Sequence, residues 1–264
     1  MLEQAFLDFG YTKEEYEKIR NTFPVINLRD ETLLNNFQNT TKFLLNNGYT
    51  KADIIKMAKI FPSLFGIGTQ SLRKKVEFMV SLGYERENVL KMTKRLPALF
   101  GYSIENIKQR IEDIKIFGFT KEEIIQMTSI SPAIFSYGID SIREKMTDLE
   151  ALGYTKKEVI RMIKLFPALL GSSIESIREK VKFYDSINMH ELFIVDPKDF
   201  MQSTKLSYAR YEFYKVKGIK IDMTNYRKLF LGSKRFEKNY GITKEELLEK
   251  YKYEDYIKTE SKAK

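Results

Sequence analysis

The sequence predicts an all-α protein built as a helical-repeat array, with two α-helices and one 3₁₀ turn in each unit. Three observations lead to this prediction. A proline, a glycine and a methionine each recur every 35 residues over four units. Apolar residues recur at helical spacing, and no stretch alternates with the period of two that a half-buried strand requires. The landmarks are Pro62, Pro97, Pro132 and Pro167; Gly48, Gly83, Gly118 and Gly153; and Met57, Met92, Met127 and Met162.

The first helix of each unit is predicted to begin at a threonine that follows the recurring glycine. Glycine suits the left-handed end of the preceding helix. Thr120 suits an N-cap, and Glu123 completes the capping-box pattern three residues later. The same signature occurs at Thr155 with Glu158, Thr12 with Glu15 and Thr243 with Glu246. Within this helix an apolar stripe is expected on the face that carries the recurring methionine.

The proline is predicted to end the first helix, because the residue before a proline is pushed out of the α region. The segments 62–65, 97–100 and 167–170 read Pro-Ser-Leu-Phe, Pro-Ala-Leu-Phe and Pro-Ala-Leu-Leu. Each is too short for an α-helix and predicts a 3₁₀ turn that inserts two apolar side chains into the core. A second amphipathic helix follows, as the apolar positions Ile174, Ile177, Val181 and Tyr184 show.

The whole chain is expected to form a single array of about six or seven units, of right or left hand. The outer units are less regular, because Pro24 and Gly10 lie 38 residues before the next landmarks and Asn188 stands where a fifth glycine is due. A shortened copy is expected near Pro197, since end repeats cap a core that interior repeats share. The expected parts are an N-terminal capping unit (1–47), four regular repeats (48–187), degenerate basic repeats (188–238) and a C-terminal cap helix and tail (239–264).

Composition excludes several kinds of function. The 264 residues include no cysteine, which removes disulfides, thiolate nucleophiles and cysteine-bound metals and fits a reducing compartment. His190 is the one histidine, so multi-histidine zinc sites and most histidine relays are excluded, and a structural or exposed role is expected for it. No phosphate-binding loop or paired-acid constellation occurs. We therefore expect no enzyme activity, no cofactor and no metal.

Targeting signals are also missing from the sequence as it stands. No apolar run approaches the roughly 20 residues that span a bilayer. The first eight residues carry two acids and no base, unlike a signal or transit peptide. We expect a soluble protein without membrane insertion, cytoplasmic if the host is bacterial. Otherwise we expect the mitochondrial matrix, after removal of a transit peptide that is not seen here.

The repeat unit resembles that of the mTERF family, named for the mitochondrial transcription termination factor. The shared features are glycine, an aromatic residue and threonine, then Pro-x-Leu-Phe, and a second helix that ends in Leu-Gly, as at 82–83 and 152–153. The tail is similar to the closing repeats of the family, through Leu206 to Arg210, Gly218, Leu229-Phe230, Ser233, Phe236 and Gly241. The resemblance implies a curved array whose concave face binds nucleic acid, mostly double-stranded, in organellar gene expression. The Lys-, Ile- and Asn-rich composition looks bacterial or typical of an AT-rich organelle.

Cations recur in register with the repeats. Two columns on the second helix are Arg73, Lys108, Arg143 and Arg178, and, two residues later, Lys75, Arg110, Lys145 and Lys180. A third on the first helix, Lys56, Lys91 and Arg161, is interrupted by Gln126. Two residues are about 200° apart on a helix, so the first two columns flank the apolar stripe on opposite sides. Rows of cations suit a phosphate backbone, although the same residues could simply solvate a helix surface.

The segment 204–238, called the basic segment below, holds most of the charge. It has ten basic and three acidic residues, a net charge of +7 out of +9 for the chain. Aromatic residues alternate with these cations; the periodicity favours core positions for Phe213, Phe230 and Phe236 and leaves Tyr208, Tyr211, Tyr214 and Tyr226 half-exposed. The best predicted phosphate contacts are Arg210, Arg227, Lys228, Lys234 and Arg235, followed by Lys205, Arg143, Arg178, Lys75, Arg110, Lys145 and Lys180.

Three functional hypotheses remain open at this stage. The first is a monomer that binds double-stranded nucleic acid, with DNA favoured and RNA as the alternative. It would regulate transcription, including termination, by tracking the phosphate backbone in its concave groove. The second is a repeat scaffold or effector that binds a protein partner and no nucleic acid. The third is recruitment to an anionic membrane surface through the basic segment.

Overall fold

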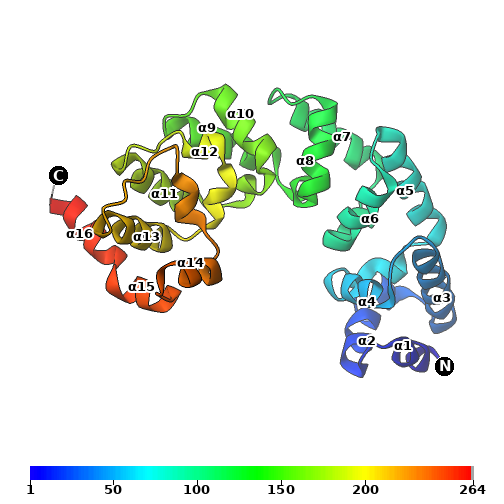
Figure 1. The fold of residues 1–264 in the computed structure, drawn as a ribbon. Coiled ribbons are helices and arrows are strands. Elements are labelled where there is room, and N and C mark those ends of the chain that lie inside the picture. The colour runs from blue at the N-terminus through cyan, green and yellow to red at the C-terminus, as the bar shows by residue number, and fades with distance from the viewer. Residues whose placement is uncertain (263–264) are drawn as a thin grey trace. The chain divides into compact units, whose positions relative to one another are not determined.

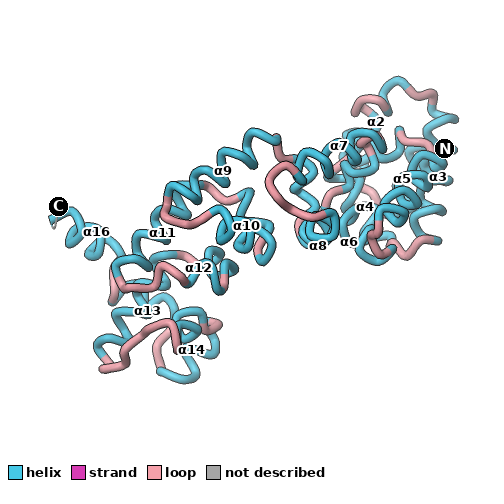
Figure 2. Tube along the Cα trace, turned by 90° about the horizontal axis from the view of Figure 1, so that it is seen from above, coloured by secondary structure: helices cyan, strands magenta, loops and turns pink. Residues whose placement is uncertain are grey.

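The computed structural model describes residues 1–262, and every regular element among them is helical (Figure 2). The described residues contain no strand, which confirms the all-α prediction. None of their helices has both the length and the apolar character needed to cross a membrane. The chain divides into two compact units, Met1–Ile139 and Asp140–Lys264, and each is described separately below.

In the first unit, a short 3₁₀ helix follows each pair of α-helices; the α-helices are labelled in Figure 1. Its elements are α1 (Leu2–Phe9), α2 (Lys13–Arg20), η1 (Val25–Asn27), α3 (Asp30–Asn46), α4 (Lys51–Ile60), η2 (Pro62–Gly66), α5 (Thr69–Leu82), α6 (Arg86–Arg95), η3 (Pro97–Phe100), α7 (Ile104–Lys115), α8 (Lys121–Ile130) and η4 (Pro132–Ser136). First helices contact first helices (α2, α4, α6 and α8 in turn), and among the 3₁₀ helices η2 contacts both η1 and η3. Successive repeats of this unit therefore pack in register.

The second unit contains one regular repeat and then shorter ones. Its elements are α9 (Ile139–Ala151), α10 (Lys156–Leu165), η5 (Pro167–Gly171), α11 (Ile174–Ser186), α12 (Leu192–Val195), η6 (Pro197–Met201), α13 (Thr204–Val216), η7 (Tyr226–Phe230), α14 (Ser233–Tyr240), α15 (Lys244–Lys250) and α16 (Tyr253–Lys262). Helix α13 contacts α11, η7, α15 and α16, so it is the centre around which the end of the chain packs.

The predicted helix boundaries are confirmed. The four recurring glycines have φ between +88° and +111°, a conformation that favours glycine. Complete capping boxes begin the first helices at Thr12, Thr120, Thr155 and Thr243. Thr50 forms another with Asp53, which the Glu-based pattern did not identify. The recurring methionines are at most 1% exposed, so this column belongs to the core.

The proline motif also folds as predicted. The residues before the four prolines (Phe61, Leu96, Ser131 and Phe166) have φ between −131° and −140° and ψ between 77° and 81°, outside the α region. Each proline then begins a 3₁₀ helix. The paired apolar side chains that follow, such as Leu64 and Phe65, are buried. The motif thus turns the chain and fills the core in one step.

Buried hydroxyl pairs join neighbouring repeats in the first unit. The hydroxyl groups of Tyr49 and Thr93 are 2.6 Å apart, and those of Tyr84 and Thr128 are also 2.6 Å apart. Both threonines donate their own hydrogen to a helix carbonyl, so each tyrosine must be the donor in its pair. Burial raises the pKa of Tyr49 and of Tyr84 to about 12, which keeps both hydroxyls protonated. Phe119 occupies the next position of this series and has no hydroxyl.

The repeats near the C-terminus lose their first helix. Asn188 has a φ of 56°, so it adopts the left-handed conformation at the position where a glycine was expected. The first helix after it, α12, is a single turn. The 3₁₀ helix η6 begins at Pro197, where a shortened repeat was predicted. The next repeat has no first helix, because η7 follows α13 with only a loop between them. The basic segment therefore lies on α13, η7 and α14.

Candidate nucleic-acid interface

The first turn of α14 exposes two adjacent cations, Lys234 and Arg235. Neither forms a hydrogen bond or ion pair with another described residue. The turn contains no acid, although acidic residues are the ones that stabilise a helix N-terminus. Two cations at this position do not stabilise the helix. An anion bound here would contact both of them together with the free N–H groups of the helix start, so the turn is suited to binding an anion.

Arg227 and Lys228 lie on η7, and both contact tyrosine rings. The Arg227 guanidinium carbon is 5.9 Å from the centre of the Tyr226 ring, and the Lys228 amine is 6.0 Å from that of Tyr214. Arg227 is exposed, whereas Lys228 is half-buried. A hydrogen bond to Tyr226 and, more weakly, the charges of two aspartates on the neighbouring segment raise the pKa of Arg227. Arg227 therefore lies close enough to two acids for their charges to shift its pKa.

These two acids are Asp196 and Asp199, which the sequence did not identify as part of the site. The Oδ2 atom of Asp199 is buried and has no hydrogen-bond partner. Burial, and then the charge of Asp196, raise the pKa of Asp199 to about 7, while Arg227 opposes this shift. Asp196 and Asp199 are three residues apart at a 3₁₀ turn, and this local pattern does not predict that Asp199 is partly buried.

The structure contradicts the predicted phosphate contact of Arg210. Its side chain is 1% exposed and lies over Phe236, with the guanidinium carbon 4.9 Å from the ring centre. Its Nη1 atom donates to the Leu229 carbonyl at 2.7 Å and to Gln202 Oε1 at 3.3 Å. Burial lowers the pKa of Arg210. Arg210 thus joins α13 to η7 and α14 and has no surface to offer to a phosphate.

The second cation column was also predicted to contact phosphate. In the structure, three of its four members form hydrogen bonds within the protein instead. The Lys75 amine donates to the Phe100 carbonyl of the next repeat, and the Lys145 amine donates to the Ser172 carbonyl at 2.7 Å. Lys180 is 8% exposed and donates to Ser176 Oγ at 2.8 Å. Burial lowers the pKa of Lys75 and of Lys180. Lys75 and Lys145 satisfy carbonyls at the ends of 3₁₀ helices, where a cation is favourable.

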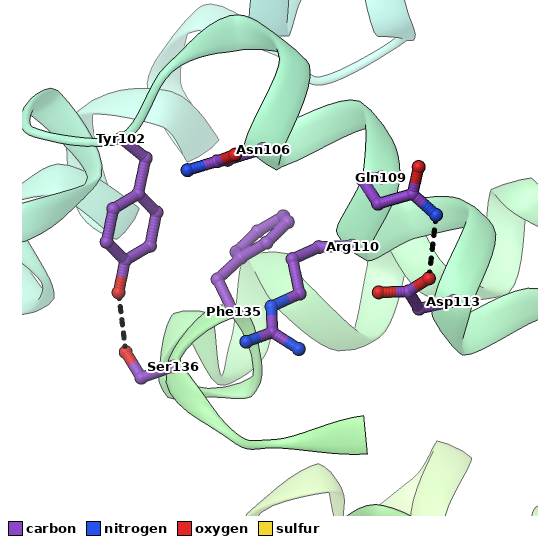
Figure 3. A pocket seen from close by; sticks show the side chains of 7 residues that line it. All are labelled: Tyr102, Asn106, Gln109, Arg110, Asp113, Phe135 and Ser136. Atoms are coloured by element: carbon purple, nitrogen blue, oxygen red, sulfur yellow. Dashed lines mark hydrogen bonds between the residues drawn. The ribbon is translucent and has the colours of Figure 1, made fainter.

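Arg110 is the exception in this column. It lies in a recess of about 440 Å³ between α7 and η4, beside Asn106 and the ring of Phe135 (Figure 3). The recess is also lined by a 3.2 Å hydroxyl pair, Tyr102 with Ser136, and by a Gln109–Asp113 hydrogen bond of 2.8 Å. Arg110 forms no hydrogen bond or ion pair with another described residue. Its charge therefore remains available to a ligand.

The first cation column lies at the surface. Arg73 and Lys108 lie over the rings of Phe43 and Phe78, and Arg143 pairs with Asp140. Arg178 is exposed with no ion pair among the described residues. On the first helices, Lys91 pairs with Glu87 at 2.7 Å. Lys205, at the start of α13, pairs with Glu254 at 3.0 Å. Surface pairs of this kind contribute little stability, so a phosphate can compete for these cations.

Comparison with protein families gives a match to the mTERF family over residues 3–82 and 72–192, together more than half of the chain. The chain belongs to the mTERF family. Proteins of this family are generally nucleic-acid-binding regulators of transcription. Comparison with curated protein sequences gives no match.

The family match of this mTERF protein ends at residue 192, within α12. The basic segment lies beyond it, so the matched residues do not reach the tail that resembled the closing repeats of the family. The case for α14 and η7 as a binding surface therefore depends on their charge and exposure rather than on the match.

The aromatic residues of the basic segment divide between core and surface. Phe213 and Phe236 are buried as predicted, and Phe230 is half-buried. Tyr208 and Tyr211 are half-exposed, also as predicted. The prediction is wrong for Tyr214 and Tyr226, which are 0% and 7% exposed. The Tyr214 hydroxyl donates to the Lys228 carbonyl at 3.3 Å, so this ring fixes η7 and is not a stacking platform.

His190 has a structural role in this mTERF protein. Its ring stacks on Tyr154 with the centres 4.4 Å apart and an angle of 16°. Its Nδ1 atom lies 2.6 Å from Asp185 Oδ1. Over the described part of the chain, no group of three or more His, Asp or Glu side chains is arranged to hold a metal ion.

Proposed function

We propose that this protein binds double-stranded nucleic acid, DNA in preference to RNA, and thereby regulates transcription. The binding surface is formed by the exposed cations Arg227 on η7 and Lys234 and Arg235 in the first turn of α14, together with the half-buried Lys228. Arg178, an exposed cation of the same unit, extends the contact along the phosphate backbone. The role in transcription is proposed from the family.

The observation that carries the proposal is the unpaired charge at Lys234 and Arg235. Among the other cations of the predicted site, Arg210 is buried, Lys145 donates to a carbonyl and Lys205 pairs with an acid, whereas Arg178 and Arg110 form no ion pair with another described residue. Lys234 and Arg235 are exposed at a helix start that has no acid. A phosphate bound there would meet two side-chain charges and the helix N-terminus together.

The test is fluorescence anisotropy with a labelled duplex DNA of random sequence, at three salt concentrations. Each phosphate contact contributes about 0.9 to the slope of log affinity against log salt. The double variant Lys234→Ala with Arg235→Ala should therefore reduce the slope by about 2 and weaken binding at every sequence tested. The matching RNA duplex and a single strand, titrated in parallel, report the preference for DNA and for two strands.

The chain provides a matched control. Lys156 and Lys157 are also adjacent, exposed and in the first turn of a helix, but they lie in a turn that holds the capping-box acid Glu158. Changing both to Ala removes the same charge and should leave the salt slope unchanged. Equal effects of the two double variants would mean that only net charge matters. Weak duplex binding that neither pair affects would overturn the proposal.

A further inference from the structure

A recess in the second unit is lined by three half-exposed tyrosines, Tyr208, Tyr211 and Tyr256. It lies between α11, α13 and α16, has a volume of about 410 Å³, and lies outside both η7 and α14. The three tyrosine rings stand at 77°, 83° and 89° to the ring of Phe183, with centres 5.7–6.3 Å from it. Phe183 is 1% exposed, so the tyrosines pack edge-to-face on a buried ring, and their exposed parts line the recess.

A carboxylate completes the lining. Glu212 follows Tyr211 on α13 and lies one helical turn from Tyr208, so all three occupy one face of the helix. Burial, followed by the charges of Glu212 and Asp255, raises the pKa of Tyr208. The recess therefore combines tyrosine rings with a carboxylate.

Lys215 shows how a cation meets this lining. Its amine lies 3.3 Å from Glu212 Oε1, yet the lysine side chain is 65% exposed whereas that of Glu212 is 23% exposed. The carboxylate thus belongs to the wall, and the ammonium remains at the rim. A primary ammonium is strongly hydrated and stays in water, whereas an alkylated ammonium is weakly hydrated and gains from contact with ring faces.

We propose that this recess binds an alkylated ammonium group, carried by a small molecule or by a methylated lysine side chain of a partner protein. The rings of Tyr208, Tyr211 and Tyr256 surround the methyl groups, and Glu212 neutralises the charge after displacing Lys215. A nucleic-acid base fits the site less well, because the wall is acidic and the unpaired cations of η7 and α14 do not line it. This site is independent of the proposed nucleic-acid surface.

The experiment is ligand-observed proton NMR on the full chain, with choline and Nε-trimethyl-lysine as probes. Ring currents should shift the N-methyl resonance upfield in a saturable manner. The neutral isostere of choline, 3,3-dimethyl-1-butanol, should bind at least tenfold more weakly, since it lacks the charge. Tighter binding of trimethyl-lysine would assign the group to a protein side chain, and tighter binding of choline would assign it to a small molecule.

Variants separate a cation–π site from a merely apolar one. Tyr211→Leu and Glu212→Gln should each weaken choline binding about five- to tenfold, whereas Tyr211→Phe, which keeps the ring, should stay within about twofold. Lys215→Met should strengthen binding, because it frees Glu212. Tyr137→Leu, in the first unit, is the control and should have no effect. Equal affinity for the neutral isostere, an unaffected Tyr211→Leu variant, displacement of choline by an oligonucleotide, or no saturable binding would each overturn the proposal.

Discussion

Replacing Asp199 by Asn should make the protein more stable at neutral pH, although the substitution removes a charged side chain. Asp199 has a buried Oδ2 atom with no hydrogen-bond partner, and its pKa is raised from 3.8 to about 7. The folded protein therefore binds a proton that the unfolded chain releases at a much lower pH. Between these two pKa values, each rise in pH lowers the free energy of unfolding of the wild type.

The size of the effect follows from the pKa change. A shift of about 3 units at about 1.4 kcal/mol per unit gives an upper value near 4 kcal/mol. The side chain keeps some access to water, so solvent screening reduces this, and we expect about 1–3 kcal/mol. The Asp199→Asn variant lacks this titration. The difference between variant and wild type should be close to zero near pH 4, grow as the pH rises toward 7, and stay constant above that.

The assay is hydrogen exchange of amides in α11 and α13, together with urea unfolding, at several pH values between 4 and 8. Asp222→Asn is a control of opposite sign. Hydrogen bonds from Thr224 lower the pKa of Asp222, so its contribution to stability is present above the unfolded pKa and lost as the pH falls. A difference for Asp199→Asn that does not change with pH, or that shrinks toward pH 7, would refute the reasoning.

Three further predictions test the fold. Tyr84→Phe removes the buried donor to Thr128 and should lower the free energy of unfolding by about 1 kcal/mol, measured by urea denaturation. Gly83→Ala should lower the free energy of unfolding by about 1–2 kcal/mol, because the φ of Gly83 is +111°. Gly68→Ala is the control: its φ is −64° and an added Cβ meets nothing within 4 Å, so the change should be less than about 0.5 kcal/mol. Equal effects of the two substitutions would contradict the conformational argument. Arg210→Met should destabilise the second unit by about 2–3 kcal/mol, yet leave the salt slope of duplex binding unchanged; a slope reduced by about one unit would show that this residue contacts phosphate after all.

The sequence predicts the repeat well because its landmarks act through local backbone physics. A positive φ requires glycine or asparagine, a helix start requires a capping side chain, and a proline excludes the α conformation from the residue before it. Each constraint acts within three or four residues, so it is visible without knowledge of the rest of the fold. Even Asn188 follows this logic, since it adopts the conformation of the glycine it replaces.

The candidate site is less predictable because burial depends on the neighbouring repeat. Helix geometry places Arg178 and Lys180 on opposite sides of α11, but it does not predict that Lys180 is buried while Arg178 is exposed. Arg210 and Lys234 carry the same charge, but Arg210 is enclosed by the ring of Phe236 and by the acceptors of Leu229 and Gln202. The aromatic recess joins side chains from three helices, and no local pattern indicates such a meeting.

The hydroxyl pairs between repeats have a consequence for how such a chain can change its length. Tyr49 and Thr93 are 44 residues apart, and so are Tyr84 and Thr128. Duplication or deletion of a 35-residue unit among the repeats that carry both partners keeps this separation, so the new neighbours meet with their bonds intact. An insertion of a few residues inside a first helix rotates the threonine away from its partner and leaves a buried hydroxyl without its hydrogen bond. In evolution, and in protein engineering, these repeats should therefore be gained or lost as complete units.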